Sequence, residues 1–297
     1  MKHLVTIYLL FAASCICALA DNYIGLWAGG GVALLGDDLE QTTAKAGIGG
    51  RVGLGWQYQK RMFTIEIGVE GTYQKHNIAV GQQTYSFPAT DSQGKQFTYN
   101  AIISERTDNS RTLDLQVPVL LGIEVKHFYL LAGGKFNANL LGTTATSALL
   151  STSGDYNRYY ETLENMPNHG FFENQAVASK GNISFNFDAR LHFELGAVLR
   201  QNHNYDNRSN KYRIGLFAEI GLLNLNRGNF NQTATAITKT NPASVEINHI
   251  YTSAESNHAK LRGSTIGLRL SVLLPVGKQQ SAYNSKCNCY QELFYFH

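Results

Sequence analysis

Apolar and polar side chains alternate along residues 47–59 and again along 62–74. A period of two predicts β-strands, because successive side chains of a strand point to opposite faces. Only Lys60 and Arg61 separate the two stretches, so we expect a tight antiparallel hairpin, although the turn lacks an Asn-Gly or Asp-Gly pair. The apolar face of the first stretch consists of Ile48, Val52, Leu54, Trp56 and Tyr58.

The alternation recurs in six further stretches, which brings the predicted total to eight strands. Two of these stretches are separated only by Lys126 and His127 and predict a second hairpin. The longest alternation has a period that no helix produces. The six stretches are 24–34, 112–125, 128–140, 183–200, 212–222 and 264–274.

Charged side chains of both signs lie on the polar face, deep within the predicted strands. A charge at the lipid midplane costs roughly 2–4 kcal/mol for Arg or Lys, whereas charges that point into a narrow barrel can pair with one another. A barrel of about eight strands has an interior just wide enough to be filled by side chains. The charges concerned are Arg51, Glu66, Glu70, Asp114, Asp188, Arg190, Glu194, Arg213, Glu219 and Arg269.

The connections between the predicted strands alternate in length. The short ones are 60–61, 126–127 and 201–210, and the long ones are 36–46, 75–111, 141–182 and 226–260. Aromatic residues of the apolar face gather beside the short turns, at Trp56, Tyr58, Phe63, Phe128 and Tyr212. Both features are typical of outer-membrane barrels. We therefore predict an all-β fold, an eight-stranded antiparallel up-and-down transmembrane β-barrel with short periplasmic turns and long extracellular loops.

The two ends of the chain lie outside this pattern. Residues 1–20 read as a signal peptide, with Lys2 before an apolar run that is shorter than the roughly 20 residues of a spanning helix. Cleavage near Ala20 would deliver the barrel, residues 21–276, to the bacterial outer membrane. A loose lipobox ending at Cys15 leaves lipidation open. Residues 277–297 form a C-terminal tail of unassigned role, in which Cys287 and Cys289 are expected to be incidental or intermolecularly bonded.

Composition narrows the class of protein further. The chain has 28 Gly, 16 Tyr and 15 Phe, an enrichment that favours β structure. A net charge of +3 without a basic cluster gives no reason to expect nucleic acid as a partner. The mean hydropathy of −0.20 resembles that of a soluble protein, but alternating faces cancel in such an average.

No residue carries a recognisable catalytic, cofactor-binding or metal-binding signature. His192 shares a strand face with Asp188, Arg190 and Glu194, and we interpret it as part of an interior hydrogen-bond and ion-pair network. Solvent exposure is expected for the histidines of the long connections, and none has metal-ligand spacing. These are His76, His169, His249 and His258.

The stretch Leu115–Gly122, with its internal Pro118, resembles a strand motif of the outer-membrane β-barrel family that includes PorT-like proteins, small barrels of the OmpA type. Leu130–Lys135, Tyr212–Gly221 and Gly267–Leu270 add to the resemblance. Proline removes a donor from the sheet, so we expect a bulge or a missing bond at Pro118.

The resemblance implies a non-enzymatic envelope, surface-binding or secretion-accessory role. Its expected partners are outer-membrane lipid and, through the long loops, an envelope or extracellular protein. The alternatives are an outer-membrane enzyme acting on lipid or peptide and a soluble lipocalin-like periplasmic binding barrel. A water-filled porin is disfavoured, because such pores have roughly 16–18 strands.

Overall fold

The computed structural model describes residues 21–90, 94, 96–155, 163–164, 171–200, 209–238 and 244–276. Within these ranges lie thirteen strands and two short 3-10 helices. The predicted signal peptide, the C-terminal tail and most of the 201–210 connection lie outside the described residues. The elements are β1 (Asp21–Gly36), β2 (Thr42–Lys60), β3 (Phe63–Val80), β4 (Gln83–Thr90), β5 (Gln96–Val125), β6 (Phe128–Asp155), β7 (Leu163–Glu164), β8 (Gln175–Asn182), β9 (Asp188–Arg200), β10 (Lys211–Gly221), β11 (Thr235–Thr238), β12 (Ser244–Ile247), η3 (Ile250–Thr252), η4 (Ala254–Ser256) and β13 (Arg262–Val276).

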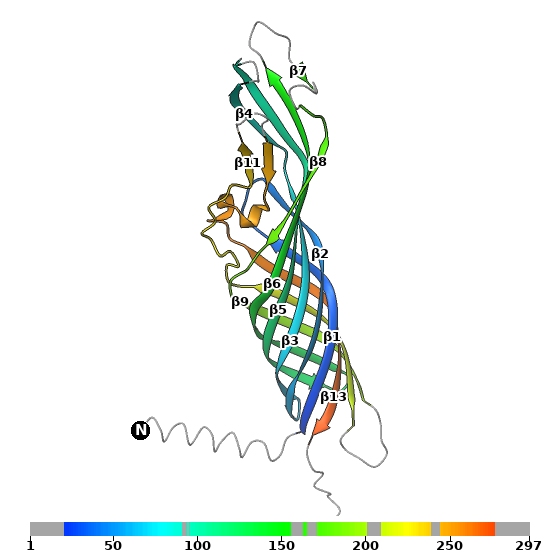
Figure 1. Cartoon of the computed structure of the whole chain (residues 1–297). Coiled ribbons are helices and arrows are strands. Elements are labelled where there is room, and N and C mark those ends of the chain that lie inside the picture. Colours follow the sequence, from blue (N-terminus) through cyan, green and yellow to red (C-terminus); the bar gives the residue numbers. More distant parts are fainter. Residues whose placement is uncertain are drawn as a thin grey trace, which may run out of the picture.

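The strand pairings form a closed, antiparallel ring. Following the pairs leads from β1 through β2, β3, β5, β6, β9, β10 and β13 and back to β1. Figure 1 shows this ring as the lower part of the molecule, with β1 and β13 side by side. A ring without an open edge satisfies the backbone donors and acceptors of every strand within it.

The ring has its apolar side chains outside and its charges inside. Outward side chains in the middle of the ring are largely exposed, for example Leu54 at 60% and Leu195 at 61%. All ten charges predicted for the polar face are buried. The prediction that the charged face of the strands points into the ring is therefore confirmed. Of the predicted aromatic residues, Tyr58 is an exception, because its side chain is buried while Trp56 beside it is exposed.

The predicted total of eight strands was wrong, because segments expected to be long loops contain further strands. Most of 75–111 lies in β3, β4 and β5, and much of 141–182 lies in β6 and β8. These segments alternate polar side chains with Ala, Gly and aromatic residues, so they lack the regular apolar face that marks the strands of the ring. They form a tall β structure above the ring (Figure 1), here named the extension: residues 74–112 and 142–182 where described.

Residues 225–238 and 244–261 form a second structure above the ring, here named the cap segment. It contains the β11–β12 hairpin, η3 and η4. Its apolar side chains pack on inward residues at the upper ends of β1 and β3. This core consists of Leu35, Ile78, Val80, Ile183, Leu225, Ile250, Tyr251, Ala259 and Leu261.

The two short turns have the predicted lengths. Arg61–Met62 joins β2 to β3, and Lys126–His127 joins β5 to β6. Arg61 and Lys126 take positive φ angles of 56° and 54°, so the conformation usually supplied by Asn or Gly is here adopted by basic residues. The β9 strand begins at Asp188 rather than at Ile183 as predicted, because residues 183–187, between β8 and β9, do not pair as a strand.

Pro118 interrupts one of its two strand pairings. Between β3 and β5 the paired positions run to Ile67 and Val119 and resume at Glu70 and Gln116 in the same register. Pairing with β6 continues through Pro118. The proline therefore removes local pairing on the β3 side without a bulge, which is one of the two outcomes that its missing N–H predicts.

Candidate functional site: the lumen, the extension and the level between them

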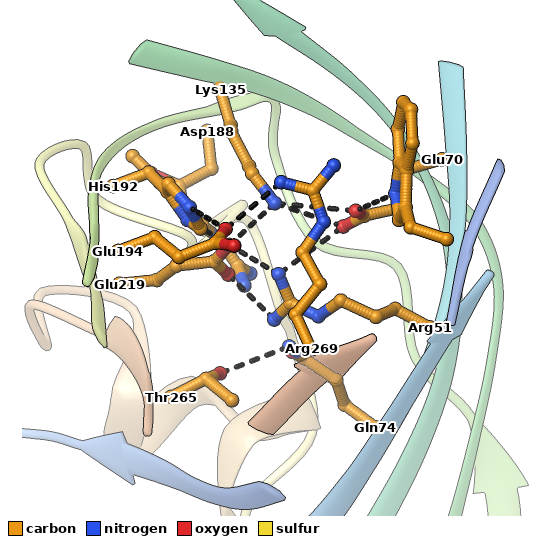
Figure 2. Close-up of polar contacts among 12 residues, drawn as sticks. Arg51, Glu70, Gln74, Lys135, Asp188, His192, Glu194, Glu219, Thr265 and Arg269 are labelled. Atoms are coloured by element: carbon orange, nitrogen blue, oxygen red, sulfur yellow. Dashed lines mark hydrogen bonds and ion pairs between the residues drawn. The ribbon is translucent and has the colours of Figure 1, made fainter. Parts of the chain in front are cut away.

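Buried ion pairs fill the middle of the ring (Figure 2). Arg51 on β2 pairs with Glu219 on β10 and, at 3.3 Å, with Glu70 on β3. Lys135 on β6 lies between the same two carboxylates, 3.1 Å from Glu70 and 2.7 Å from Glu219. Because every one of these groups is desolvated, each depends on its partners to remain charged.

A second set of ion pairs adjoins the first. Arg269 on β13 bridges Glu66 at 2.5 Å and Glu194 at 2.9 Å. The two ring nitrogens of His192 lie 2.9 Å from Glu219 and 3.1 Å from Glu194, so His192 joins the two sets. Both its nitrogens are engaged by carboxylates of the network, as the interior interpretation predicted.

Aromatic rings complete the packing of the buried cations. The guanidinium of Arg51 lies 3.9 Å from the ring centre of Phe217, and that of Arg269 lies 4.4 Å from that of Trp27. Trp27 also donates from Nε1 to Glu70 at 2.7 Å. Cation–aromatic contacts of this kind gain strength where water is excluded.

The inward position of Trp27 was not predicted, because the glycines of β1 obscure its alternation. The signal for it lies on the neighbouring strands. A Cβ added to Gly53, Gly55 or Gly68 would come within 2.4, 2.9 or 2.5 Å of the Trp27 indole. Glycines that share one face of β2 and β3 thus make the space for one large side chain.

A third cluster lies beside the short turns. Glu124 accepts from Arg213 at 2.5 Å, from Lys211 at 2.9 Å and from the half-exposed Arg200 at 2.8 Å. Arg213 also donates to Gln57 at 2.7 Å. The charged interior therefore continues to the lower end of the ring, and its geometry is that of a cross-linked plug rather than of a substrate pocket.

Two of the histidines expected to be exposed are buried instead. His76 lies on the inward face of β3, and His249 is the N-cap of η3, where Nδ1 accepts from the Tyr251 N–H at 3.2 Å. Burial lowers the pKa of each to about 4, and the neighbouring Arg190 adds to the effect at His76. His258 is exposed as expected, and His169 lies outside the described residues.

Charged and polar contacts hold the cap segment to the extension. Asp108 on β5 pairs with Arg106 at 3.0 Å and accepts from the Ile250 N–H at 2.8 Å. Arg106 donates to the Asn248 carbonyl at 2.6 Å. The Tyr251 hydroxyl donates to Asp37, and this contact together with burial raises the Tyr251 pKa. These contacts fix the η3 segment directly above the ring.

The extension has an apolar core on its inward side. Aromatic side chains dominate it, with Tyr99 5.1 Å from Phe87 and 5.8 Å from Phe171 between ring centres. The core consists of Phe87, Ala89, Tyr99, Ala101, Ile103, Ala148, Leu150, Phe171 and Ile247. On its outward side, β6 carries Thr143, Ser147, Ser151 and Ser153. The extension thus has the polarity of a water-exposed protein.

The change of polarity falls at one level on three adjacent strands. The last outward apolar row is Tyr73, Leu113 and Leu141, which are direct neighbours across β3, β5 and β6. Two residues further from the ring along each strand, the outward row is Lys75, Arg111 and Thr143. A cleft of about 620 Å³ opens at this second row.

Other candidate chemistry is sparse in the part of the chain that the structure describes. Its residues include no group of three or more His, Cys, Asp or Glu side chains that could hold a metal ion. Cys287 and Cys289 lie outside it. Within the same residues, no helix is long and apolar enough to cross a membrane.

Comparison with known proteins gives little information about this chain. No protein-family model matches it, and a search of curated proteins finds no match. Among solved structures, one similar chain is the crystal structure of Ail, the attachment invasion locus protein of Yersinia pestis, in complex with the heparin analogue sucrose octasulfate. The identity is 9% and the TM-score 0.24, over 85% of this chain and 98% of that one. A likeness at this level carries no argument about fold or function.

Proposed function

We propose that this protein is an outer-membrane β-barrel whose extension and cap segment form a non-enzymatic binding surface outside the cell. The observation that carries the proposal is the reversal of polarity along β5 and β6. Apolar side chains face outward from Leu113 to Ile123, a length that matches the roughly 9–11 residues of a tilted membrane-spanning strand. Beyond that level the same strands face outward mostly with polar residues, as strands in water do.

The inverted ring also argues against a soluble lipocalin-like barrel. Such a barrel would place its apolar face inside to bind a ligand and its charges in water. Here Leu121, Leu216 and Phe128 are 60%, 64% and 68% exposed, while Glu219 and Arg269 are each 1% exposed. An outward apolar band of this extent is stable only when lipid or detergent covers it.

The eight strands of the ring suit a structural anchor better than a pore. Ion pairs cross-link β2, β3, β6, β9, β10 and β13 through the lumen. The short turns at Arg61–Met62 and Lys126–His127 would face the periplasm, and the extension would face the outside.

The non-enzymatic part of the proposal rests on the state of His192. Both of its nitrogens are held by Glu194 and Glu219, and all three side chains are buried. An acid–base residue needs a proton within reach of a substrate atom. An activity toward lipid or peptide that His192→Ala abolished would favour the enzyme alternative instead.

Fractionation and surface labelling test the location and orientation. The protein should require detergent for extraction, and its gel migration should change on heating. In whole cells, a membrane-impermeant maleimide should label Ser147→Cys in the extension but not Lys126→Cys in the short turn, with the unsubstituted chain as background. Recovery in the soluble periplasmic fraction would contradict the location, and labelling of Lys126→Cys alone would reverse the orientation.

A further inference from the structure

The cleft at the level where the polarity changes is basic. Its outward wall carries Lys75 on β3, Arg111 on β5 and Lys180 on β8, with Asn109, Thr143 and Asn182 between them. The register explains their proximity. Lys75 pairs with Arg111, Arg111 with Thr143, and Thr143 with Asn182, while Lys180 lies in the next outward row, opposite Ala145. Four adjacent strands therefore present one continuous polar row.

The three cations of this cleft lack acidic partners. Among the described residues, none of Lys75, Arg111 and Lys180 forms an ion pair, in contrast to the buried cations of the lumen. The next outward row, paired across β2, β3, β5 and β6, is Lys45, Asn77, Asn109 and Ala145 and adds no acid. Within the part of the chain that the structure describes, no acidic side chain pairs with these cations.

The position of the cleft relative to the apolar band selects the kind of anion. Lys75 and Arg111 lie two residues from Tyr73 and Leu113 on the side away from the ring, which is about 7 Å along a strand. Side chains at that distance from the last apolar row would lie among lipid headgroups. The cleft also faces sideways from the sheet, toward neighbouring lipid, because its residues continue the outward faces of β3 and β5.

We propose that this basic cleft binds the phosphate group of a glycolipid headgroup in the outer leaflet of the membrane. Lys75, Arg111 and Lys180 would neutralise the phosphate, and the side chains of Asn109, Asn182 and Thr143 would donate hydrogen bonds to its oxygens. The proposal rests on the proposed membrane location and deepens it by naming a lipid partner.

Lipid retention after reconstitution tests this proposal. The full-length protein is inserted into phosphatidylcholine vesicles that contain lipid A, a phosphorylated glycolipid, and the lipid that remains bound after extraction is measured by native mass spectrometry. Parallel vesicles contain dephosphorylated lipid A. The test variant is Lys75→Gln/Arg111→Gln/Lys180→Gln, and the matched control, Lys60→Gln/Arg61→Gln, removes cations at the opposite end of the ring.

The wild-type protein and the matched control should retain lipid A, and the triple variant should retain roughly tenfold less, because each Lys or Arg near an anionic headgroup contributes to binding. Arg111→Lys alone should keep most of the retention.

Two results would overturn the proposal. One is that the wild-type protein retains dephosphorylated lipid A as well as it retains lipid A. The other is that a triple variant that still shows heat-modifiable migration retains as much lipid A as the wild-type protein. Displacement of the lipid by inorganic phosphate or a soluble sulfated oligosaccharide would also overturn it, because that would indicate a soluble ligand. A protein that fails to enter any vesicle would instead contradict the membrane location itself.

Discussion

The lower and upper parts of β5 and β6 belong to the same two strands but have opposite polarity. In the ring, β5 carries Leu113 to Ile123 outside and Asp114, Gln116 and Glu124 inside. In the extension, β5 carries Asn109 and Arg111 outside and Tyr99, Ala101 and Ile103 inside. The backbone and its pairing are continuous through the change, apart from local register shifts.

This difference shows that the choice of the apolar face depends on what surrounds the sheet and not on how its strands pair. A period of two gives the same strand whichever face is apolar. Which face is apolar depends on what lies outside the sheet, and in the proposed membrane location this is lipid around the ring and water around the extension. The two regions should therefore respond in opposite ways to the same kind of substitution, and the predictions below test that contrast.

Removing a carboxylate from the lumen should have the largest effect. Glu219→Gln deprives both Arg51 and Lys135 of a buried partner, and breaking a buried pair costs about 3–5 kcal/mol in unfolding free energy. Urea unfolding in detergent micelles measures this loss. Glu255→Gln, at an exposed position in η4, is the control and should change stability little. A loss at Glu219 no larger than that at Glu255 would show that the network does not stabilise the ring.

A charge on the outward face should distinguish lipid from water. Val119 and Ile102 both lie on β5, face outward and are 37% exposed. Val119→Arg should cost about 2–4 kcal/mol in vesicles, because the guanidinium would sit in the apolar band. Ile102→Arg should cost within about 0.5 kcal/mol, because water surrounds that site. Unfolding by urea, followed by tryptophan fluorescence, compares the two. Equal costs would remove the evidence that the two regions face different solvents.

The strands of the ring could be predicted well because the pattern that encodes each of them lies within a short stretch of the sequence. Alternation located all eight ring strands, and the charges on their polar faces, such as Glu66 and Arg269, are buried as expected. The two-residue turns followed from the spacing of the hairpins alone. The buried place of His192 could also be inferred from the charges that share its strand face.

The extension and cap segment could not be predicted in the same way. Their strands mix Thr, Ser and Asn with apolar residues, for example from Thr143 to Asp155, so the composition looks like that of a loop. The contact between Asp108 and the Ile250 N–H joins positions far apart in the chain, and no local pattern encodes it. For the same reason the convergence of Lys75, Arg111 and Lys180 became visible only with the strand register.

Weakening the attachment of the cap segment should affect the upper region alone. Asp108→Asn removes the charge that pairs with Arg106 but keeps an acceptor for Ile250. We expect a loss of about 1.5–3 kcal/mol in local stability, as for hydrogen bonds to charged groups. Hydrogen exchange of residues 247–261 measures it, and Asp38→Asn, whose contact to the Lys260 N–H is exposed, is the control. A simultaneous loss of heat-modifiable migration would contradict the independence of the two regions.

Acidification should give the smallest effect, and again only in the upper region. Burial lowers the pKa of His249 from 6.5 to about 4, against an opposing effect of Asp108 and a supporting one of Arg106. When the cap segment is released, His249 binds a proton with its ordinary pKa, so stability is complete above pH 6.5 and falls as the pH drops toward 4. Between pH 7 and 6 the loss is on the order of 1 kcal/mol.

His249→Asn keeps a side-chain acceptor for the Tyr251 N–H but does not titrate. After correction for the intrinsic pH dependence of amide exchange, it should remove most of the pH dependence of protection in residues 247–261, leaving the part due to His76. The exposed His258→Asn should leave that pH dependence unchanged. A pH profile that is the same in all three proteins would place the acid-sensitive group elsewhere in the cap segment.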